Sequence, residues 1–296
     1  MIEKLEKCKL CPRECGINRL ENKIGMCGGG ANVKIALASI HKFEEPCISG
    51  TRGSGTVFFS NCNLKCKFCQ NYEISQQGRG KEITIEELSN TFLELQEKGV
   101  HNINLVSPTI YVYQIIEALE IAKQKGLHIP IVYNTNGYEK EETIELLNDY
   151  IDVYLPDLKY ASNDIAKKYS GVNHYFEIAT KCILKMQEQV KEVKINEEGT
   201  MEKGLMVRHL ILPNYLYNSK YVLKWMKENL KDDTYVSIMA QYFPTYLANK
   251  IEKLNRKLTI KEYKEIEKYV CFLNFKNGYF QELGMQEEEY VPKWEF

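Results

Sequence analysis

The sequence lacks an excess of charge of either sign. Its 296 residues contain 39 Lys and Arg and 40 Asp and Glu, which gives a formal net charge of −1. Acidic and basic residues are interspersed, so no basic stretch stands out that would attract nucleic acid or an anionic membrane. We therefore expect neither a nucleic-acid partner nor a membrane partner.

Long apolar runs are missing as well. No stretch approaches the roughly 20 apolar residues that a membrane-spanning helix needs. Residues 1–7 are mostly charged and lack the apolar segment of a secretory signal. We expect a cytoplasmic protein, monomeric by default, whose length permits a substantial core.

Cysteine, in contrast, is abundant, with ten residues. Disulfides are rare in a reducing compartment, where clustered cysteines more often bind metal. Seven of the ten form two clusters, Cys8, Cys11, Cys15 and Cys27 in the first and Cys62, Cys66 and Cys69 in the second. We expect Cys47 to be a packed small residue, and Cys182 and Cys271 to be buried, inert thiols.

The second cluster has the spacing Cys-x3-Cys-x2-Cys and directly follows an apolar strand predicted at residues 56–59. Three thiolates on one short loop can each bind one iron of a cubane, which leaves the fourth iron without a protein ligand. An open coordination position distinguishes a reactive metal site from a structural one. The alternative is a zinc knuckle, or a structural cluster whose fourth ligand lies elsewhere.

From about residue 55, apolar strands alternate with amphipathic helices, as in a parallel α/β sheet. Two helices begin at capping boxes, at Thr84 and Thr259, and a polar loop is predicted at 191–203. The six predicted strands are 56–59, 103–106, 129–133, 153–155, 205–212 and 235–239. Residues with useful chemistry recur at their carboxyl ends, where α/β barrels place active sites.

The three-cysteine spacing, with Phe68 before the last cysteine, resembles the radical S-adenosylmethionine (SAM) superfamily. Further motifs resemble its pyruvate formate-lyase-activating-enzyme-like group and follow the expected order along most of the chain. These motifs are residues 44–50, 53–55, 69–72, 134–138, 157–159 and 208–210. The resemblance implies an open, TIM-like (β/α)6 partial barrel, which we assign to residues 51–296.

The same resemblance implies that Cys62, Cys66 and Cys69 bind a [4Fe-4S] cluster whose fourth iron binds SAM. Reductive cleavage of SAM would yield a 5'-deoxyadenosyl radical that removes a hydrogen atom from a substrate, such as a glycine of a glycyl-radical enzyme. It also implies a reduced flavodoxin or ferredoxin-type electron donor and an anaerobic setting. The alternatives are an iron–sulfur electron carrier or redox sensor without catalysis, and a zinc-organised interaction module.

The candidate SAM-binding residues lie mainly at predicted strand ends. They are Phe68, Thr109, Thr135, Asn136, Asp157, Lys159, Arg208 and Gln241. Asp157 and Lys159 should point to the same side because side chains alternate along a strand. Arg208 interrupts an apolar strand and needs an anionic partner if it is buried. We expect its neighbour His209 to be a core histidine.

Two departures from the group bear on the glycyl-radical assignment more than on SAM binding. Activating enzymes usually carry Gly-Gly-Glu after the second strand, where this chain has Ser107-Pro108-Thr109. They often have a histidine after the sixth strand, where this chain has Gln241, which can form a hydrogen bond but cannot act as an acid.

The first cysteine cluster has the spacing Cys8-x2-Cys11-x3-Cys15-x11-Cys27. Four thiolates form a closed site that suits structural zinc or an auxiliary iron–sulfur cluster. We favour zinc, because nothing in the sequence demands a second redox centre, and the auxiliary cluster is the alternative. Residues 1–50 have little apolar periodicity, so we expect them to form a Cys-rich extension that folds around this metal.

Overall fold

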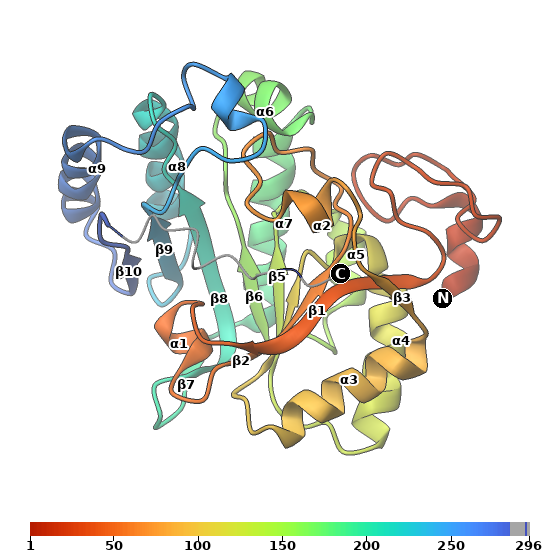
Figure 1. The fold of residues 1–296 in the computed structure, drawn as a ribbon. Helices are drawn as coiled ribbons and strands as arrows, with labels where there is room; N and C mark the ends of the chain where they lie inside the picture. The colour runs from red at the N-terminus through yellow and green to blue at the C-terminus, as the bar shows by residue number, and fades with distance from the viewer. Residues whose placement is uncertain (285–293, 295–296) are drawn as a thin grey trace.

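The parallel strands of the protein form one open, curved sheet in a computed structural model that describes residues 1–284 and 294 (Figure 1). The strands are β1 (Val33–His41), β2 (Ser54–Phe59), β3 (Lys81–Ile83), β4 (Ile103–Val106), β5 (Ile131–Thr135), β6 (Val153–Pro156), β7 (Lys194–Ile195), β8 (Met201–Leu210), β9 (Tyr235–Met239) and β10 (Gly278–Phe280). Their order is β10-β9-β8-β6-β5-β4-β2-β1-β3, with β7 paired to β8. The end strands β3 and β10 do not pair with each other, so the barrel is partial.

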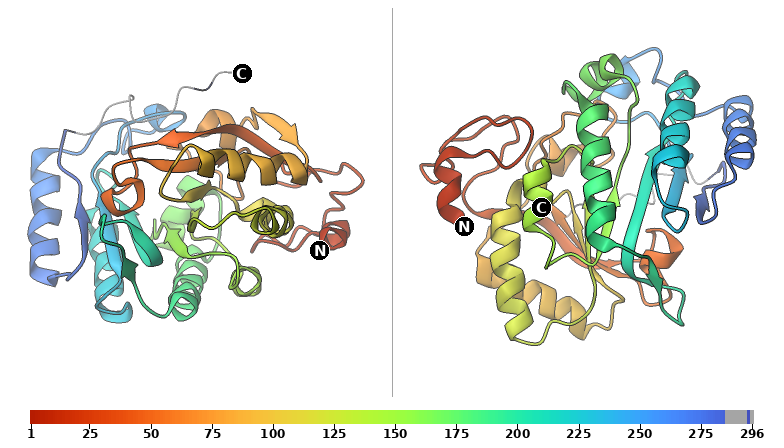
Figure 2. Two further views of the ribbon diagram at one scale, coloured as in Figure 1. Left: turned by 90° about the horizontal axis from the view of Figure 1, so that it is seen from below. Right: turned by 180° about the vertical axis from the view of Figure 1, so that it is seen from behind.

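The six predicted strands correspond to β2, β4, β5, β6, β8 and β9, which are parallel and follow chain order. The helices that connect them lie outside the curved sheet (Figure 2). Because the strands are parallel, their carboxyl ends meet at one edge. The predicted fold class is therefore confirmed.

The helices begin largely where the sequence predicts them. They are α1 (Pro46–Ser49), α2 (Tyr72–Ser75), α3 (Ile85–Glu97), α4 (Val112–Gln124), α5 (Glu141–Leu146), α6 (Asn163–Ser170), α7 (Tyr175–Val190), α8 (Leu216–Asn229) and α9 (Ile260–Leu273), with 3-10 turns at η1 (Ile2–Lys7), η2 (Thr109–Tyr111) and η3 (Ala248–Lys250). Both predicted capping boxes are present, at Thr84 and Thr259. None of the described helices combines the length and apolar content that a membrane crossing requires.

The segment assigned to the N-terminal extension contributes directly to the sheet. Strand β1 pairs antiparallel with β2 on one side and with β3 on the other. The prediction missed β1 because its inward and outward residues are only partly buried and show no clear apolar alternation.

The loop predicted at 191–203 is also wrong in part, since β7 forms a hairpin with the start of β8. The assigned core extends to residue 296, of which 285–293 and 295–296 lie outside the described residues.

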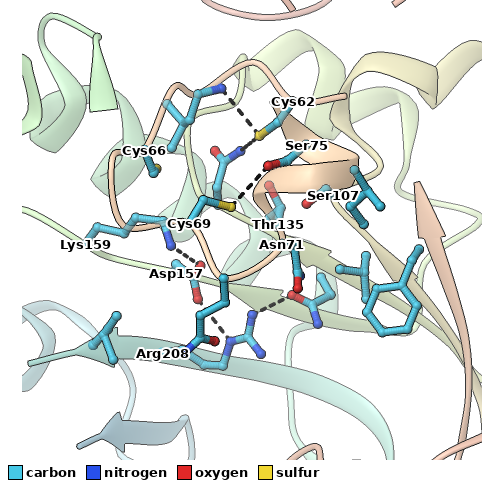
Figure 3. Close-up of a pocket in the computed structure, with 18 of the residues that line it drawn as sticks. Cys62, Cys66, Cys69, Asn71, Ser75, Ser107, Thr135, Asp157, Lys159 and Arg208 are labelled. Atoms are coloured by element: carbon cyan, nitrogen blue, oxygen red, sulfur yellow. Dashed lines mark hydrogen bonds and ion pairs between the residues drawn. The ribbon is translucent and has the colours of Figure 1, made fainter. Parts of the chain in front are cut away.

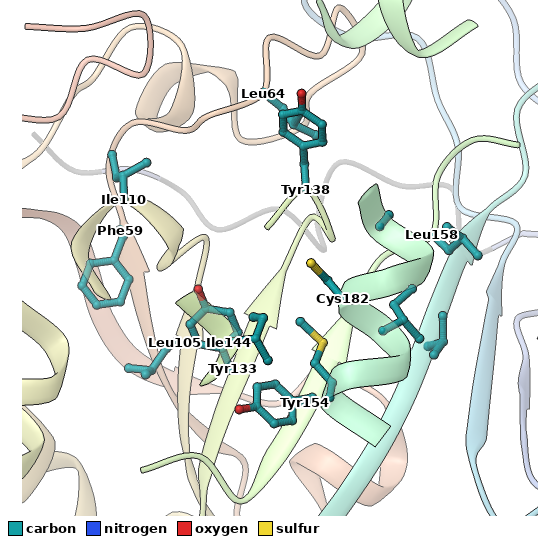
Figure 4. Close-up of a cluster of buried hydrophobic side chains, with 14 of the residues drawn as sticks. Phe59, Leu64, Leu105, Ile110, Tyr133, Tyr138, Ile144, Tyr154, Leu158 and Cys182 are labelled. Carbon is teal, nitrogen blue, oxygen red and sulfur yellow. The ribbon is translucent and has the colours of Figure 1, made fainter. Parts of the chain in front are cut away.

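The carboxyl group of Glu139 is buried and contacts Tyr133, one of the buried side chains that Figure 4 labels. Glu139 Oε1 accepts hydrogen bonds from Thr109 (2.6 Å), Tyr133 (3.4 Å) and Thr135, while Oε2 has no partner among the described residues. Burial raises the pKa of Glu139 to about 7, even though the three hydroxyl donors lower it. The carboxyl group is therefore largely protonated at mildly acidic pH.

The turn after β5 holds the ends of β5 and β6 together. Gly137 has φ +80°, and a Cβ atom there would lie 2.3 Å from the carbonyl oxygen of Asp157. The Tyr175 hydroxyl donates to the carbonyl oxygens of Asn136 (2.8 Å) and Asp157 (2.9 Å), which joins the same two strand ends. Only glycine allows this close approach.

We expect Gly137→Ala to lower the free energy of unfolding by about 1–3 kcal/mol more than Gly126→Ala does, because the new methyl group must displace backbone atoms. Gly126 is the matched control, since it has φ +103° and a Cβ atom added there would meet no atom within 4 Å. Urea unfolding of the two variants measures the difference. Equal losses would contradict the close approach.

The raised pKa of Glu139 predicts a specific pH dependence. The folded state binds this proton more tightly than the unfolded state, so the stabilisation is complete below about pH 4.5 and is lost as the pH rises through about 7. The free energy of unfolding of the wild type, relative to Glu139→Gln, should thus fall by roughly 3 kcal/mol across this window. Glu141→Gln, at an exposed position of α5, is the control. A difference that does not change with pH would refute the assignment.

Candidate active site

A pocket of about 260 Å3 opens at the carboxyl edge of the parallel strands (Figure 3). It gathers residues from the cysteine loop and from the ends of β5, β6, β8 and β9. The predicted site residues that line it are Cys62, Cys66, Phe68, Cys69, Thr135, Asn136, Asp157, Lys159, Arg208 and Gln241. Thr109 is the exception, because its buried hydroxyl points to Glu139 instead.

The cysteine loop leaves β2 and is fastened through its backbone. The N–H groups of Lys65 and Lys67 donate to the carbonyl oxygens of Ser170 (2.9 Å) and Tyr169 (2.8 Å) at the end of α6. The Lys67 carbonyl in turn accepts from the N–H of Leu247 (3.0 Å). These contacts fix the position of the loop over the strand ends.

Each of the three thiols has a polar neighbour. The Leu64 N–H donates to Cys62 Sγ (3.4 Å), the Ser170 hydroxyl lies 2.9 Å from Cys66 Sγ, and the Ser75 hydroxyl lies 3.1 Å from Cys69 Sγ. Hydrogen bonds to sulfur stabilise thiolates and tune the potential of a bound cluster. The serines were not predicted from the sequence, since nothing in their spacing relates them to the cysteines.

Burial raises the pKa of Cys62 and of Cys66 to about 11 and raises the pKa of Cys69. A metal must therefore replace the protons for the thiolates to form near neutral pH. No three Cys, His, Asp or Glu side chains in the described part of the chain surround the position of a single metal ion. Three thiols that share a pocket but not a single-ion site fit the larger [4Fe-4S] unit, in which each sulfur binds a different iron.

An ionic network forms the floor of the pocket. The Lys159 ammonium pairs with Asp157, and Arg208 Nε donates to Asp157 Oδ1 at 3.1 Å. Burial alone would raise the pKa of Asp157, but Lys159 and Arg208 lower it below its usual value. Burial tends to lower the pKa of Lys159, while Asp157 and then Cys66 raise it above the usual value. Both groups are therefore charged near neutral pH.

Arg208 has a second carboxylate partner that the sequence analysis missed. Its Nη1 lies 3.2 Å from Glu44 Oε2, and its Nη2 donates to Asn134 Oδ1 at 2.5 Å. Glu44 Oε1 also accepts from the amides of Asn104 (3.2 Å) and Asn134 (3.3 Å). Glu44 belongs to a motif noted in the sequence, but only the pairing of β1 with β2 brings it to the end of β8.

Asn136 connects the turn after β5 to the cysteine loop. Its side-chain amide donates to Asn63 Oδ1 (2.8 Å) and lies 3.4 Å from Cys62 Sγ. The Thr135 hydroxyl lines the pocket but donates to Glu139. The turn and the loop are therefore joined next to Cys62.

Two further candidates lie at the pocket wall. Phe68 packs edge-on against Tyr242, with ring centroids 6.0 Å apart, and also faces the pocket. Gln241 accepts a hydrogen bond from the Gln281 side chain (3.0 Å). This position of Phe68 is compatible both with packing of the loop and with contact with a ligand.

The other singled-out residues lie outside the pocket. His209 is buried between the Leu158 carbonyl (2.7 Å) and the Ser219 hydroxyl (2.9 Å), and burial lowers its pKa to about 4, as expected for a core histidine. Cys47 packs in an apolar cluster with Ile48, and Cys182 is buried. The prediction for Cys271 is wrong, because this thiol is exposed on the outer face of α9.

Comparison with known proteins agrees with this geometry. Residues 56–197 match the Radical SAM superfamily. An uncharacterized protein of Methanocaldococcus jannaschii is 32% identical over 275 residues, which cover 89% of this chain and 73% of the relative. The pyruvate formate-lyase-activating enzyme of Clostridium pasteurianum is 23% identical over 79% of this chain and 94% of its own length.

The fold is also similar to a solved structure, that of Streptococcus suis SuiB bound to S-adenosylmethionine. The TM-score is 0.50 at 15% identity, over 76% of this chain and 49% of SuiB, so this chain spans about half of the length of SuiB. At this identity the likeness concerns the fold alone. The family match carries with it a [4Fe-4S] cluster and SAM as the cofactors of the superfamily. This chain is an enzyme of the radical SAM superfamily and is similar to its pyruvate formate-lyase-activating enzymes.

Proposed function

We propose that Cys62, Cys66 and Cys69 hold the [4Fe-4S] cluster and that SAM binds beside it in the pocket at the strand ends. The observation that carries this proposal is that the three thiols share one pocket with Asp157, Lys159 and Arg208. No other cysteine among the described residues lines that pocket. The cluster would thus keep one iron free for SAM.

When bound and reduced, the cluster and SAM supply a 5'-deoxyadenosyl radical that removes a hydrogen atom from the substrate. The chain binds and orients the reactants and excludes water. Lys159, next to Cys66, offers an ammonium group to the SAM carboxylate. Asp157 offers a carboxylate to the SAM amine or ribose, and the Asn136 amide and the Phe68 ring line the same pocket.

The guanidinium of Arg208 has a different role in this proposal. Its contacts with Asp157, Glu44 and Asn134 use three of its five N–H donors. It therefore positions the Asp157 carboxylate and keeps at most two donors for a ligand. Thr109 lies outside the pocket and is better assigned to the support of Glu139.

For the substrate, we propose a glycine in a partner protein, with a reduced flavodoxin or ferredoxin-type protein as electron donor and the cytoplasm as the location. The support is the similarity to the Clostridium pasteurianum enzyme along nearly its whole length. Because the Gly-Gly-Glu stretch is missing, the SAM amine would be held either by Asp157 or by backbone carbonyls near Ser107, and both residues line the pocket. The division into an extension, residues 1–50, and a barrel core, residues 51–296, stays a prediction, and β1 of the first segment pairs with β2 and β3 of the second.

The first test is SAM cleavage. Anaerobically reconstituted protein with dithionite and SAM should release 5'-deoxyadenosine, measured by chromatography, and Cys66→Ala should reduce the release to background because the cluster loses one of three ligands. Cys271→Ala, at an exposed thiol far from the pocket in sequence and fold, is the matched control and should behave as wild type. If reduced wild-type protein released no 5'-deoxyadenosine and SAM left its cluster spectrum unchanged, an electron carrier would be the better assignment.

The second test concerns Lys159. Loss of one charge-assisted hydrogen bond costs about 1.5–3 kcal/mol, so Lys159→Met should weaken SAM binding roughly 10- to 100-fold. The affinity is measured by titrating SAM against the electron paramagnetic resonance (EPR) signal of the reduced cluster. Lys185→Met, on the outer face of α7, is the control. Unchanged affinity in Lys159→Met would show that this ammonium does not touch SAM.

The partner is tested separately, with deuterated glycine incorporated into candidate proteins. Deuterium transfer into 5'-deoxyadenosine and a glycyl-radical EPR signal would identify the target. SAM cleavage without transfer to any glycine-labelled protein would reject the glycyl-radical assignment and leave the cofactor assignment intact.

A further inference from the structure

The four N-terminal cysteines surround a second pocket, apart from the one described above. Cys8, Cys11, Cys15 and Cys27 all line it, together with Arg19 and five other residues. Three of the thiols are buried and Cys15 is exposed. Four thiols from a 20-residue stretch thus face one small space beside the barrel, in the N-terminal segment of Figure 1.

A buried arginine at this pocket lacks an acidic partner. Arg19 is 2% exposed, and its guanidinium donates to the carbonyl oxygens of Gly30 (2.5 Å) and Ile110 (2.6 Å) and lies 3.9 Å from Cys8 Sγ. No ion pair of Arg19 with a carboxylate occurs in the described part of the chain. A buried positive charge needs a nearby negative one. Four thiolates with a dication carry a net charge of about −2 and would supply it.

The thiols also receive backbone hydrogen bonds that suit metal-bound sulfur. The Gly29 N–H donates to Cys27 Sγ at 3.4 Å, and the Arg13 N–H donates to the Cys11 thiol. Such N–H···S bonds stabilise sulfur that carries negative charge. The pocket therefore provides both four thiols that can bind a metal and backbone N–H groups that stabilise their negative charge.

The arrangement of the thiols discriminates between zinc and a cluster. Tetrahedral zinc with Zn–S bonds of about 2.3 Å requires sulfurs roughly 3.8 Å apart. No three of these cysteines, nor any other three Cys, His, Asp or Glu residues that the structure describes, are placed around one ion. The same is true of Cys62, Cys66 and Cys69, for which a cubane is proposed above. We propose that Cys8, Cys11, Cys15 and Cys27 bind a second [4Fe-4S] cluster in which every iron has a protein ligand.

The proposed N-terminal centre lies next to the loop that carries Cys62, Cys66 and Cys69. Arg13, between Cys11 and Cys15, donates through Nε to the carbonyl oxygen of Asn63 at 2.5 Å, within the loop that carries Cys62 and Cys66. A Cβ atom on Gly28, the neighbour of Cys27, would lie 2.5 Å from the Asn61 side chain. With 3.8 Å between consecutive Cα atoms, the Cα atoms of Cys27 and Cys62 are at most roughly 15 Å apart.

Because residues beside its ligands contact the three-cysteine loop, the N-terminal cluster would hold that loop in a defined conformation. Arg19 adds to this link, because its guanidinium lies 5.6 Å from the centre of the Tyr111 ring, whose hydroxyl accepts from Asn61 at 3.3 Å. Binding of the second cluster does not depend on SAM cleavage, so the two can be tested independently.

The decisive experiment is metal analysis of the full-length protein after anaerobic purification and reconstitution. We expect about eight irons and eight sulfides per chain in the wild type, and about four of each in the variant with Cys62, Cys66 and Cys69 changed to Ala. The EPR signal of that variant after reduction should not change when SAM is added. One zinc per chain, or no metal at all, in the variant would overturn the proposal, as would four irons in the wild type.

Two single substitutions test the proposal with less risk that the variant protein fails to fold. Cys15→Ser alters the exposed ligand without disturbing packing, and should change the residual cluster spectrum in the triple-Ala background, whereas Cys271→Ser should not. Arg19→Gln removes the buried positive charge and should lower the cluster's retained iron, with Arg52→Gln, an exposed arginine paired to Glu198, as the control. Equal iron retention in the Arg19 and Arg52 variants would contradict the charge argument.

Discussion

The largely buried guanidinium of Arg208 connects four parts of the chain that are distant in sequence. It contacts Asp157 after β6, Glu44 between β1 and α1, and Asn134 at the end of β5. Removing one partner of a buried pair leaves an uncompensated charge, at a cost of about 3–5 kcal/mol. Because the guanidinium and its carboxylate partners each need the other when buried, their contacts hold the strand ends together and fix the charges that face the pocket. The carboxylates and ammonium can then serve as ligands without moving first, which lowers the entropic cost of binding.

A second set of contacts gives the cysteine loop its shape. Asn61 and Asn63 lie on either side of Cys62 in the sequence, and both are buried. Asn63 binds Asn136 of the β5 turn through its side chain and Arg13 of the N-terminal segment through its carbonyl. A loop held from both sides in this way presents its thiols at defined positions before a metal arrives. Such preorganisation distinguishes a reactive site from a flexible chelating loop.

The two sets of cysteines differ in the number of ligands that they can provide, and this number decides whether a bound cluster could also bind a further ligand. Three thiols leave one coordination position for a ligand such as SAM, while four close the site. The set of three faces the pocket at the strand ends, and the set of four faces a smaller space that Arg19 and Ile110 also line. In the proposed arrangement the two centres lie close together, so the folding of the N-terminal segment would be coupled to the assembly of the reactive centre.

Much of the fold and the centre of the site follow from local sequence. The six parallel strands, the two capping boxes and the three-cysteine loop are short-range patterns, and periodicity, cap chemistry and ligand spacing act within a few residues. Asp157 and Lys159 could be placed on one side of the chain for the same reason. These features predict a parallel α/β sheet and its reactive edge, and the resemblance to the family implies the partial barrel.

Tertiary structure alone decided the contacts between distant segments. The pairing of Glu44 with Arg208, the burial of Glu139 with Thr109, the strand β1 and the exposure of Cys271 depend on which surfaces meet after folding. The physical reason is that burial and charge pairing are properties of the packed chain, and the energy of a buried group is set by neighbours that can lie more than a hundred residues away. Local sequence sets the chemistry that is available at the strand ends, and packing sets which of these groups face the pocket.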